Sequence, residues 1–357
     1  MMDVISMGAI SAAGSEKDAQ IVAHAATRAA TAGHFSNPNL AGTPFCQGVL
    51  PDGLARDART LAIHAIEAAF ADHSGPVDRA GTALVLATGA GDLGELEAGV
   101  QSAQPYALAE QVAQATGLGG VFTTVSNACA SAGYALRVAA DLLDRGQQQV
   151  IVCGVEAKSD TSQATFKSLL ALDPQGCRPF DENRGGTVLS AGAAALLLTR
   201  PGVHPMPRAR VAGLATTCDA YHETAPDPDG TELRRAMLAA LNAASLNTDD
   251  IVVFVPHATG TRLNDEIEAE ALAALFPEEF SPGTAVLLKR EIGHSCGASA
   301  AFSVIAAVRS LETQAMAPAG DDTDQMRDPV PGHALVNAAA FGGNNVSVVI
   351  SPSGAAG

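Results

Sequence analysis

The sequence predicts a layered α/β fold built from two similar α/β halves, at residues 1–203 and 204–357. Strand-like apolar runs alternate with stretches whose apolar residues recur at helical spacing, which is the pattern of an α/β protein. A chain of 357 residues with 47% apolar residues also has enough material for a sizeable buried core. The halves repeat a similar order of strands and helices, although they share little sequence.

The first half opens with a strand-like run at 3–11, and residues 59–73 carry apolar side chains at the spacing of a helix. The continuous apolar run at 82–91 is typical of a buried strand. A strand-like run at 119–126 then gives way to an alanine-rich helical stretch. Further strands are expected at 149–157 and 186–199.

In the second half, Thr231 is expected to open a helix at 231–246, because threonine is a favoured residue at helix starts. Another helix is expected at 265–275, and a third after 293–299. The stretch 316–332 is polar and contains Pro and Gly, so it predicts a surface loop. The expected strands are 209–220, 251–260, 333–341 and 345–351.

Composition excludes several classes of protein. A net charge of −17 argues against a nucleic-acid partner, because phosphate binding depends on clustered Lys and Arg. No apolar run reaches the roughly 18 residues that a membrane span needs, and no charged-then-apolar leader opens the chain. The six cysteines lie far apart without CxxC pairs, so reduced core thiols are expected. We expect a cytoplasmic location.

Cys129 lies where the strand-like run "GGVFTTVS" gives way to the helical run that follows it. A cysteine at a helix N-terminus lies at the positive end of the helix dipole, which favours the nucleophilic thiolate. Its small neighbours, alanines and serine, leave room for a substrate. The alternative is an inert buried thiol, since free cysteines are commonly buried.

Two histidines strengthen the case for a site. His257 directly follows a buried strand, and His294 lies in a Gly-flanked turn that opens a helix. Both occupy strand-to-loop edges, where α/β proteins build their sites. For either histidine alone, a structural or solvent-exposed role is the alternative. Together with Cys129, the two histidines fit a Cys-His-His site.

Six blocks, in order, carry a resemblance over nearly the whole chain. The sequence resembles the decarboxylating, elongating β-ketoacyl synthases of the thiolase-like superfamily, and this implies a thiolase-like layered αβαβα fold. The blocks are "NACASAGYAL", "CRPFDENRGGTVLSAGAAALLL", "TTCDAYHETAPDPDG", "HATGTRLNDEIEAEAL", "KREIGHSCGAS" and "NAAAFGGNN".

The resemblance implies a role for each matching residue. Cys129 would be the acyl-accepting nucleophile, and His257 and His294 would polarise the thioester carbonyl of the extender unit. Lys289 matches the family's structural and electrostatic lysine, and Glu268 matches the glutamate that partners the first histidine. A surface lysine and a solvated helix glutamate are the alternatives for the last two.

The resemblance also implies a gate and an oxyanion hole. Phe341, followed by Gly342, matches the aromatic gate beside the nucleophile, with a plain core residue as the alternative. The backbone N–H groups of Cys129 and Phe341 would form the oxyanion hole. Three departures from the family pattern leave gating and substrate shape open. Ala258 replaces a glycine, and residues 190–192 are Ser-Ala-Gly in place of Gly-Glu-Gly. Residues 339–343 are Ala-Ala-Phe-Gly-Gly in place of Phe-Gly-Phe-Gly-Gly.

The implied reaction is a decarboxylative Claisen condensation on carrier-bound acyl and malonyl groups. Loss of CO₂ generates the carbon nucleophile, so no metal or organic cofactor is expected. The implied partners are an acyl carrier protein and a second chain, in a homodimer or a heterodimer. Since carrier proteins are acidic, docking needs local cations; the candidates are Arg56, Arg59, Arg178, Arg184 and Arg208.

Two alternative functions stay open. One is a chain-length-factor-like partner subunit, against which the intact Cys129, His257 and His294 count. The other is acyl transfer without condensation. A thiolase proper is less favoured, because no cysteine follows Cys296 near the C-terminus, and Cys296 itself is interpreted as a packing residue. The chain is compact for the family, which suggests a specialised synthase of a secondary pathway.

Overall fold

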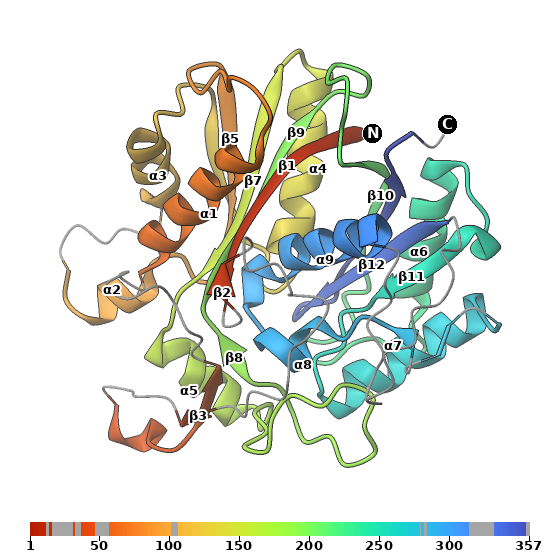
Figure 1. Ribbon diagram of the computed structural model, residues 1–357. Helices are drawn as coiled ribbons and strands as arrows, with labels where there is room; N and C mark the ends of the chain where they lie inside the picture. The colour runs from red at the N-terminus through yellow and green to blue at the C-terminus, as the bar shows by residue number, and fades with distance from the viewer. Residues whose placement is uncertain are drawn as a thin grey trace.

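The computed structural model describes residues 1–11, 37–46, 57–100, 106–278, 280–281, 284–313 and 332–354, and the backbone at 14–15 and 31–32. The predicted loop at 316–331 and the candidate Arg56 lie outside the described residues. The predicted α/β fold is confirmed (Figure 1). None of the described helices is long and apolar enough to cross a membrane.

The first half contributes nine strands and five helices to the described structure. Its strands are β1 (Met2–Ser11), β2 (Gly14–Ser15), β3 (Thr31–Ala32), β4 (Pro44–Cys46), β5 (Thr82–Ala87), β6 (Phe122–Val125), β7 (Gln149–Glu156), β8 (Leu189–Ser190) and β9 (Gly192–Thr199). Its helices are α1 (Ala58–Asp72), α2 (Leu93–Glu97), α3 (Leu108–Thr116), α4 (Ser131–Asp144) and α5 (Asp160–Ser168).

The second half contributes four strands and four helices to the described structure. Its strands are β10 (Ala209–Cys218), β11 (Ile251–Val255), β12 (His333–Ala340) and β13 (Asn344–Pro352). Its helices are α6 (Thr231–Ala244), α7 (Arg262–Leu275), α8 (Leu288–Ile292) and α9 (Ser299–Thr313), the last preceded by a 3-10 turn, Cys296–Ala298. The strands and helices expected from the sequence all form, with ends that shift by a few residues.

One mixed sheet runs through both halves in the order β11-β12-β13-β10-β1-β9-β7-β5-β6. The halves join where β1 pairs antiparallel with β10, with Asp3 opposite Arg210. Within the halves, β5 is parallel to both β6 and β7, and β11 is parallel to β12. The boundary between residues 203 and 204 stays a prediction.

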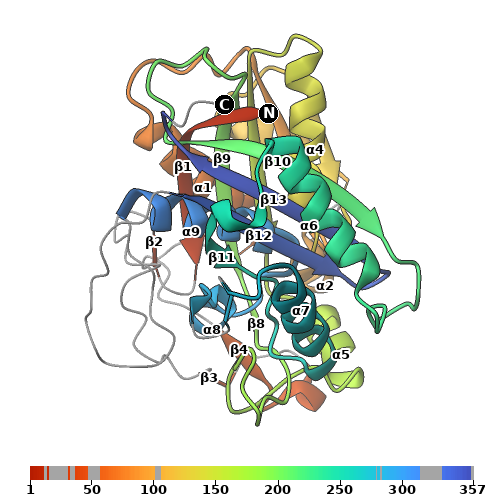
Figure 2. The same cartoon turned by 90° about the vertical axis from the view of Figure 1, so that its right-hand side faces the viewer.

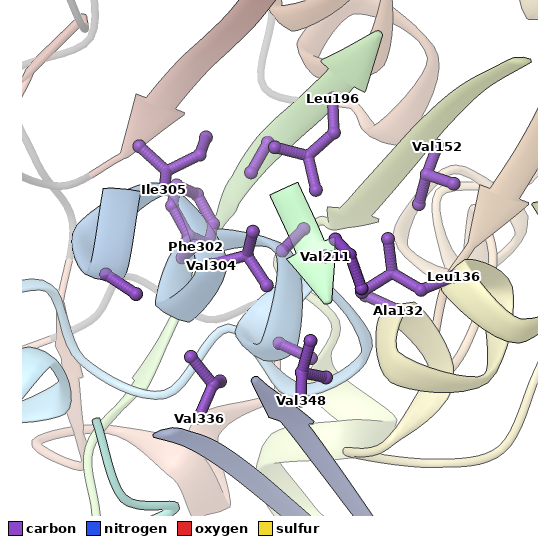
Figure 3. Close-up of a cluster of buried hydrophobic side chains, with 14 of the residues drawn as sticks. Ala132, Leu136, Val152, Leu196, Val211, Phe302, Val304, Ile305, Val336 and Val348 are labelled. Carbon is purple, nitrogen blue, oxygen red and sulfur yellow. The ribbon is translucent and has the colours of Figure 1, made fainter. Parts of the chain in front are cut away.

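Helices cover the outer face of each half and fill the space between the halves. The part of the sheet in each half counts as one β layer, so helices and sheet together give the five layers that the resemblance implies. Helices α1 and α3 pack on the strands of the first half, and α6 packs on β10 and β13 with α7 beside it (Figures 1 and 2). Helices α4 and α9 contact each other and form the middle layer. Their apolar side chains, among them Leu136 and Val304, meet those of the strands in a continuous core (Figure 3).

Small residues allow the layers to approach closely. A Cβ at Gly8 of β1 would lie 2.3 Å from the backbone of α1 at Ala65, and a Cβ at Gly133 of α4 would lie 2.8 Å from Val346 of β13. Such contacts are too short for any larger side chain. Gly8 therefore fixes how near α1 lies to β1, and Gly133 fixes how near α4 lies to the second half.

Candidate active site

The Cys129 side chain lies between the end of β6 and the start of α4. The chain turns sharply there, and Ala128 adopts φ +45°, a left-handed conformation that is unusual for a residue other than glycine. The Ser131 hydroxyl holds the turn by accepting from the Asn127 N–H at 2.8 Å and donating to the Ala128 carbonyl at 2.6 Å. Cys129 is buried, with 7% of its surface exposed.

His294 lies directly against this thiol. Its Nε2 is 3.1 Å from the Cys129 Sγ, and its Nδ1 is 3.0 Å from the Ser299 hydroxyl. The His294 backbone N–H donates to the Val188 carbonyl at 2.7 Å, which fixes the turn in front of α9. The imidazole is therefore held on both nitrogens and oriented toward the sulfur.

His257 completes a cluster of three. Its ring lies 5.6 Å from the ring of His294, centroid to centroid, in an edge-to-face arrangement. The Glu268 carboxylate accepts from the backbone N–H groups of His257 and Ala258, each at 2.7 Å. The Lys289 ammonium donates to the His257 carbonyl. Both charged side chains are buried, so the surface-lysine and solvated-glutamate alternatives do not hold.

Ala258 occupies the position where the resembling family has glycine. It adopts φ +40°, in the region that glycine enters without cost and alanine enters at about 1–2 kcal/mol. The hydrogen bond from its N–H to Glu268 holds this conformation. The substitution leaves the backbone path in place and adds strain beside His257.

Burial and neighbouring charges shift the pKa values of the side chains in this cluster. Burial, followed by the charges of Lys289 and His294, lowers the pKa of His257 well below its usual value. Burial also lowers the pKa of Lys289 and raises that of Glu268 to about 7. His257 is therefore neutral at neutral pH and able to donate a hydrogen bond without carrying charge.

The pKa of Cys129 lies well below that of an ordinary thiol. A hydrogen bond from the Cys296 thiol lowers it most, burial opposes the shift, and the neighbouring His294 and Lys289 lower it further. The start of α4 adds its positive dipole end. The thiolate, which is the nucleophilic form, is thus the favoured state.

The three residues line one pocket of about 460 Å³. Phe341 lies at the pocket with 37% of its surface exposed, and its ring is 5.7 Å from that of Phe166, which in turn lies 6.2 Å from His294. The plain-core alternative for Phe341 is therefore wrong. The position of Phe166, on α5, was not predicted from the sequence.

The turn that carries Phe341 joins β12 to β13. The Gly342 N–H donates to the Glu223 carbonyl at 2.8 Å, so this amide is already paired. A Cβ at Gly343, where φ is +80°, would lie 2.0 Å from the Asp219 carboxylate, so only glycine fits. The departure from the family pattern in this loop therefore falls on Ala339 and Ala340, and both glycines of the turn remain.

Cys296, interpreted from the sequence as a packing residue, lies beside the nucleophile. It is half-buried, adopts φ +34°, and places its Sγ beside Cys129. The Cys129 and Cys296 sulfurs and a ring nitrogen of His294 all lie within 4.8 Å of one another. Its position two residues after His294 was the signal in the sequence.

Glu156, at the end of β7, is a second residue that sequence analysis missed. Its carboxylate accepts from the N–H groups of Gly89 at 2.8 Å, Ala90 at 3.2 Å and Gly297 at 2.9 Å. Burial raises its pKa to about 7. It ties the first half to the turn that carries His294, and a glutamate ending the apolar run "QVIVCGVEA" was the available signal.

The candidate docking arginines differ in their surroundings. Arg178 pairs with Asp173 at 2.7 Å, and Arg184 lies 3.8 Å from the buried Asp265. Arg208 likewise pairs with acidic side chains, Asp72 and Glu312. Arg59 is exposed on the first turn of α1. Arg262, which was not predicted, is exposed and lines the pocket that holds Cys129.

Family models match most of the chain. The model of the β-ketoacyl synthase N-terminal domain matches residues 48–202, and that of the C-terminal domain matches residues 208–321. The chain belongs to the β-ketoacyl synthase family. The matched residues include Cys129 on the N-terminal domain and His257 and His294 on the C-terminal one.

Curated relatives of this chain are about a third identical to it over the aligned residues. Nodulation protein E of Rhizobium meliloti is 33% identical over 274 residues, 70% of this chain and 66% of that protein. The tetracenomycin polyketide synthase ketoacyl synthase alpha subunit of Streptomyces glaucescens is 33% identical over 60% of this chain and 53% of its own length. The 3-oxoacyl-[acyl-carrier-protein] synthase 2 of Mycobacterium tuberculosis is 34% identical over 64% and 60%. The alignments thus span less than two thirds of these relatives.

Solved ketosynthase structures match over nearly their whole length. A chain from the complex of ketosynthase ApeO with its chain length factor ApeC, from Xenorhabdus doucetiae, has a TM-score of 0.80 and 25% identity, covering 99% of the present chain and 98% of that chain. A chain of the ishigamide ketosynthase/chain length factor has a TM-score of 0.80, 26% identity and 99% coverage of both. The present chain therefore has the thiolase-like fold.

Alkylation by iodoacetamide should report the lowered pKa of Cys129. The pH midpoint for alkylating this residue, followed by peptide mass, is expected below that of an ordinary thiol, because the rate follows the thiolate fraction. The His294→Ala variant should shift the midpoint upward, since it removes a group that favours the thiolate. The Cys129→Ala variant gives the background from the other thiols. A wild-type midpoint at the ordinary value would contradict the assignment.

Proposed function

We propose that the protein is a β-ketoacyl-[acyl carrier protein] synthase that extends an acyl chain by decarboxylative Claisen condensation. The observation that carries this proposal is the single pocket lined by Cys129, His257 and His294, with the His294 Nε2 3.1 Å from the thiol. Only a reaction that uses both a sulfur nucleophile and a pair of imidazole donors needs all three side chains together.

In the first half-reaction, the Cys129 thiolate attacks the carbonyl carbon of an acyl thioester. The C–S bond to the carrier breaks, the carrier thiol leaves with a proton, and the acyl group stays on Cys129. Backbone N–H donors stabilise the oxyanion, and one such donor is typically worth about 3–4 kcal/mol. We assign this role to the N–H groups of Cys129 and Phe341, with the gate turn, including Gly342, placing the second donor.

In the second half-reaction, a malonyl thioester loses CO₂ and leaves an enolate whose oxygen accepts hydrogen bonds from His257 and His294. The enolate carbon attacks the acyl carbonyl on Cys129, and the thiolate departs. His257 suits this role because it is buried and neutral, and its Nδ1 has no protein partner among the described residues. Lys289 and Glu268 hold the His257 backbone and act as positioning residues.

Carbon–carbon bond formation in this scheme needs no bound cofactor, because decarboxylation supplies the electron pair. We include a cytoplasmic location in the proposal, and all six cysteines are free thiols, as expected in a reducing compartment. Two structural halves, 1–203 with the nucleophile and 204–357 with both histidines, remain the proposed domain division.

We propose a dimer, either of this chain or with a related one. Strand β6 is the edge of the large sheet, and Val121 and Phe122 are exposed on it, with 56% and 46% of their surfaces accessible. An unpaired edge with apolar side chains is a natural site for a second chain. The matched complexes pair a ketosynthase with a chain length factor, which supports the heterodimer as one form.

A chain-length-factor-like subunit is the second candidate function. The matched complexes contain such a subunit, and the strained Ala258 and the alanine in place of the first gate aromatic are departures beside the site. The polarised Cys129 favours the catalytic function, since a non-catalytic subunit has no chemical need for it. Acyl transfer without condensation would use Cys129 and release no CO₂.

We propose that Arg262 rather than Arg59 contacts the carrier protein. Arg262 lies at the pocket that holds the nucleophile. Arg59 follows Asp57, which lines a cavity of about 1000 Å³ together with Asp92, Glu95 and Glu97, so an acidic carrier would be repelled there. The internal pairing of Arg178 and Arg184 favours structural roles for them.

Mass spectrometry of the acylated protein tests the catalytic proposal. After incubation with an acyl-carrier thioester, the wild type should gain one acyl group and the Cys129→Ala variant none, because no other thiol is activated. The His257→Ala variant should be acylated like the wild type. Its release of CO₂ from malonyl carrier should fall on the order of 10²- to 10³-fold, since one enolate donor is lost.

Circular dichroism of each variant serves as the folding control. Acylation without CO₂ release by the wild type would indicate simple acyl transfer. A folded wild type that is never acylated would overturn the catalytic proposal and support the partner-subunit function.

Carrier docking is tested by charge reversal. The Arg262→Glu variant should lower kcat/KM for the acyl-carrier substrate on the order of 10-fold at low salt, because an attractive contact becomes repulsive. The loss should be smaller with an acyl pantetheine thioester that lacks the carrier. Arg59→Glu and Arg235→Glu, both at exposed arginines, are the matched controls. An unchanged kcat/KM for Arg262→Glu, or a larger loss for Arg59→Glu, would refute this docking surface.

A further inference from the structure

A second thiol lies beside the nucleophile and has no part in the condensation. The Cys129 and Cys296 sulfurs are within 4.8 Å of each other, and the two residues come from different halves of the fold. A disulfide requires the sulfurs to approach to about 2.05 Å, with Cβ atoms about 3.5–4.5 Å apart. The two sulfurs therefore have to approach each other by less than about 3 Å.

We propose that Cys129 and Cys296 form a reversible disulfide when a hydroperoxide oxidises the nucleophile. The modification takes the nucleophile out of use and shields it from irreversible oxidation. This inference rests on the juxtaposition of the two sulfurs and not on the proposed condensation.

One molecule of hydrogen peroxide is enough to oxidise the two thiols to the disulfide. The Cys129 thiolate attacks the distal oxygen of hydrogen peroxide, the O–O bond breaks, and a sulfenic acid and hydroxide form. The Cys296 sulfur then attacks the sulfenic sulfur, an S–S bond forms, and the oxygen leaves as water with the Cys296 proton. Two thiols are oxidised by two electrons, and the peroxide is reduced to water.

The two thiols have the electronic roles that this sequence of steps needs. Cys129 is the one that favours the thiolate, so it reacts first with peroxide. Its hydrogen bond and its charge raise the pKa of Cys296 and keep that thiol protonated. Oxidation of Cys129 to the neutral sulfenic acid removes that negative charge, and Cys296 becomes a better nucleophile at the moment when it is required.

The backbone at Cys296 is unusual. Cys296 is half-buried on a one-turn 3-10 segment and adopts φ +34°, a strained conformation. Glycines border it: a Cβ placed at Gly89 would lie 3.6 Å from the Cys296 Cβ, and Gly297 follows directly. Glycine at position 89 therefore leaves no side chain against Cys296 on that side.

Two of the other cysteines are poor competitors. Burial raises the pKa of Cys153, and burial raises that of Cys177 to about 12, so both stay as protonated thiols in the core. Cys46 is half-buried and Cys218 is exposed. Cys129 and Cys296 differ from both of these, because their sulfurs lie within 4.8 Å of each other.

The test is peroxide treatment of the intact protein in buffer with EDTA, followed by acid quench, denaturation and alkylation with iodoacetamide. The wild type should carry two fewer carbamidomethyl groups than the untreated protein, and a tryptic map should contain one peptide pair joined through Cys129 and Cys296. Dithiothreitol added before alkylation should restore both groups and the reactivity of Cys129.

Variants at the second thiol sharpen the result. In Cys296→Ser and Cys296→Ala, the same peroxide dose should convert Cys129 to sulfinic or sulfonic acid, which dithiothreitol does not reverse. Cys218→Ser is the matched control and should behave as the wild type. The variants' far-ultraviolet circular dichroism reports their folding, and the wild-type peptide map decides the matter even where a variant misfolds.

Three outcomes overturn the proposal. In the first, the treated wild type keeps all of its alkylatable thiols. In the second, Cys129 reaches sulfinic acid while Cys296 is still alkylated. In the third, the joined peptides contain cysteines other than Cys129 and Cys296.

Discussion

The packing of helix α4 against helix α9 is the contact on which the site depends. Each helix starts at a reactive residue, α4 just after Cys129 and α9 just after the turn that carries His294. Both helices are buried in the apolar core between the halves. Because interiors are close-packed and shift little, apolar contacts along two helices determine where a sulfur and an imidazole meet.

Buried carboxylates hold the loops of the site in position. Glu268 pairs with two N–H groups at His257, and Glu156 pairs with N–H groups from both halves of the fold. Burying a carboxylate is costly unless it is well hydrogen-bonded, and backbone N–H groups supply those bonds, with the charge of Lys289 adding to them at Glu268. The loops at the site are therefore held by charge-assisted hydrogen bonds rather than by apolar packing. This leaves their side chains free to face the pocket.

Sequence reasoning predicted the elements and the principal residues because each left a local signal. Cys129, His257 and His294 lie at strand or helix ends, and the order of the six blocks indicated that they belong to one site. The position of the Cys296 sulfur beside Cys129 had one signal in the sequence, its place two residues after His294, but its direction depends on a φ of +34° that only the folded chain sets. From the sequence, Arg178 and Arg184 were candidate cations for docking a carrier protein. Their acidic partners, Asp173 and Asp265, come within reach only once the chain is folded.

The burial of Cys129 affects the lifetime of an acyl group on this thiol in the proposed reaction. Cys129 is 7% exposed and lines the pocket, so a thioester on its sulfur has little contact with bulk water. The ring of Phe341 lies at that pocket, in contact with Phe166. In the proposed reaction, an acyl group of sufficient length fills the remaining space and excludes the water that would hydrolyse it. The partition between extension and futile hydrolysis is thus governed by how completely each starter group fills 460 Å³.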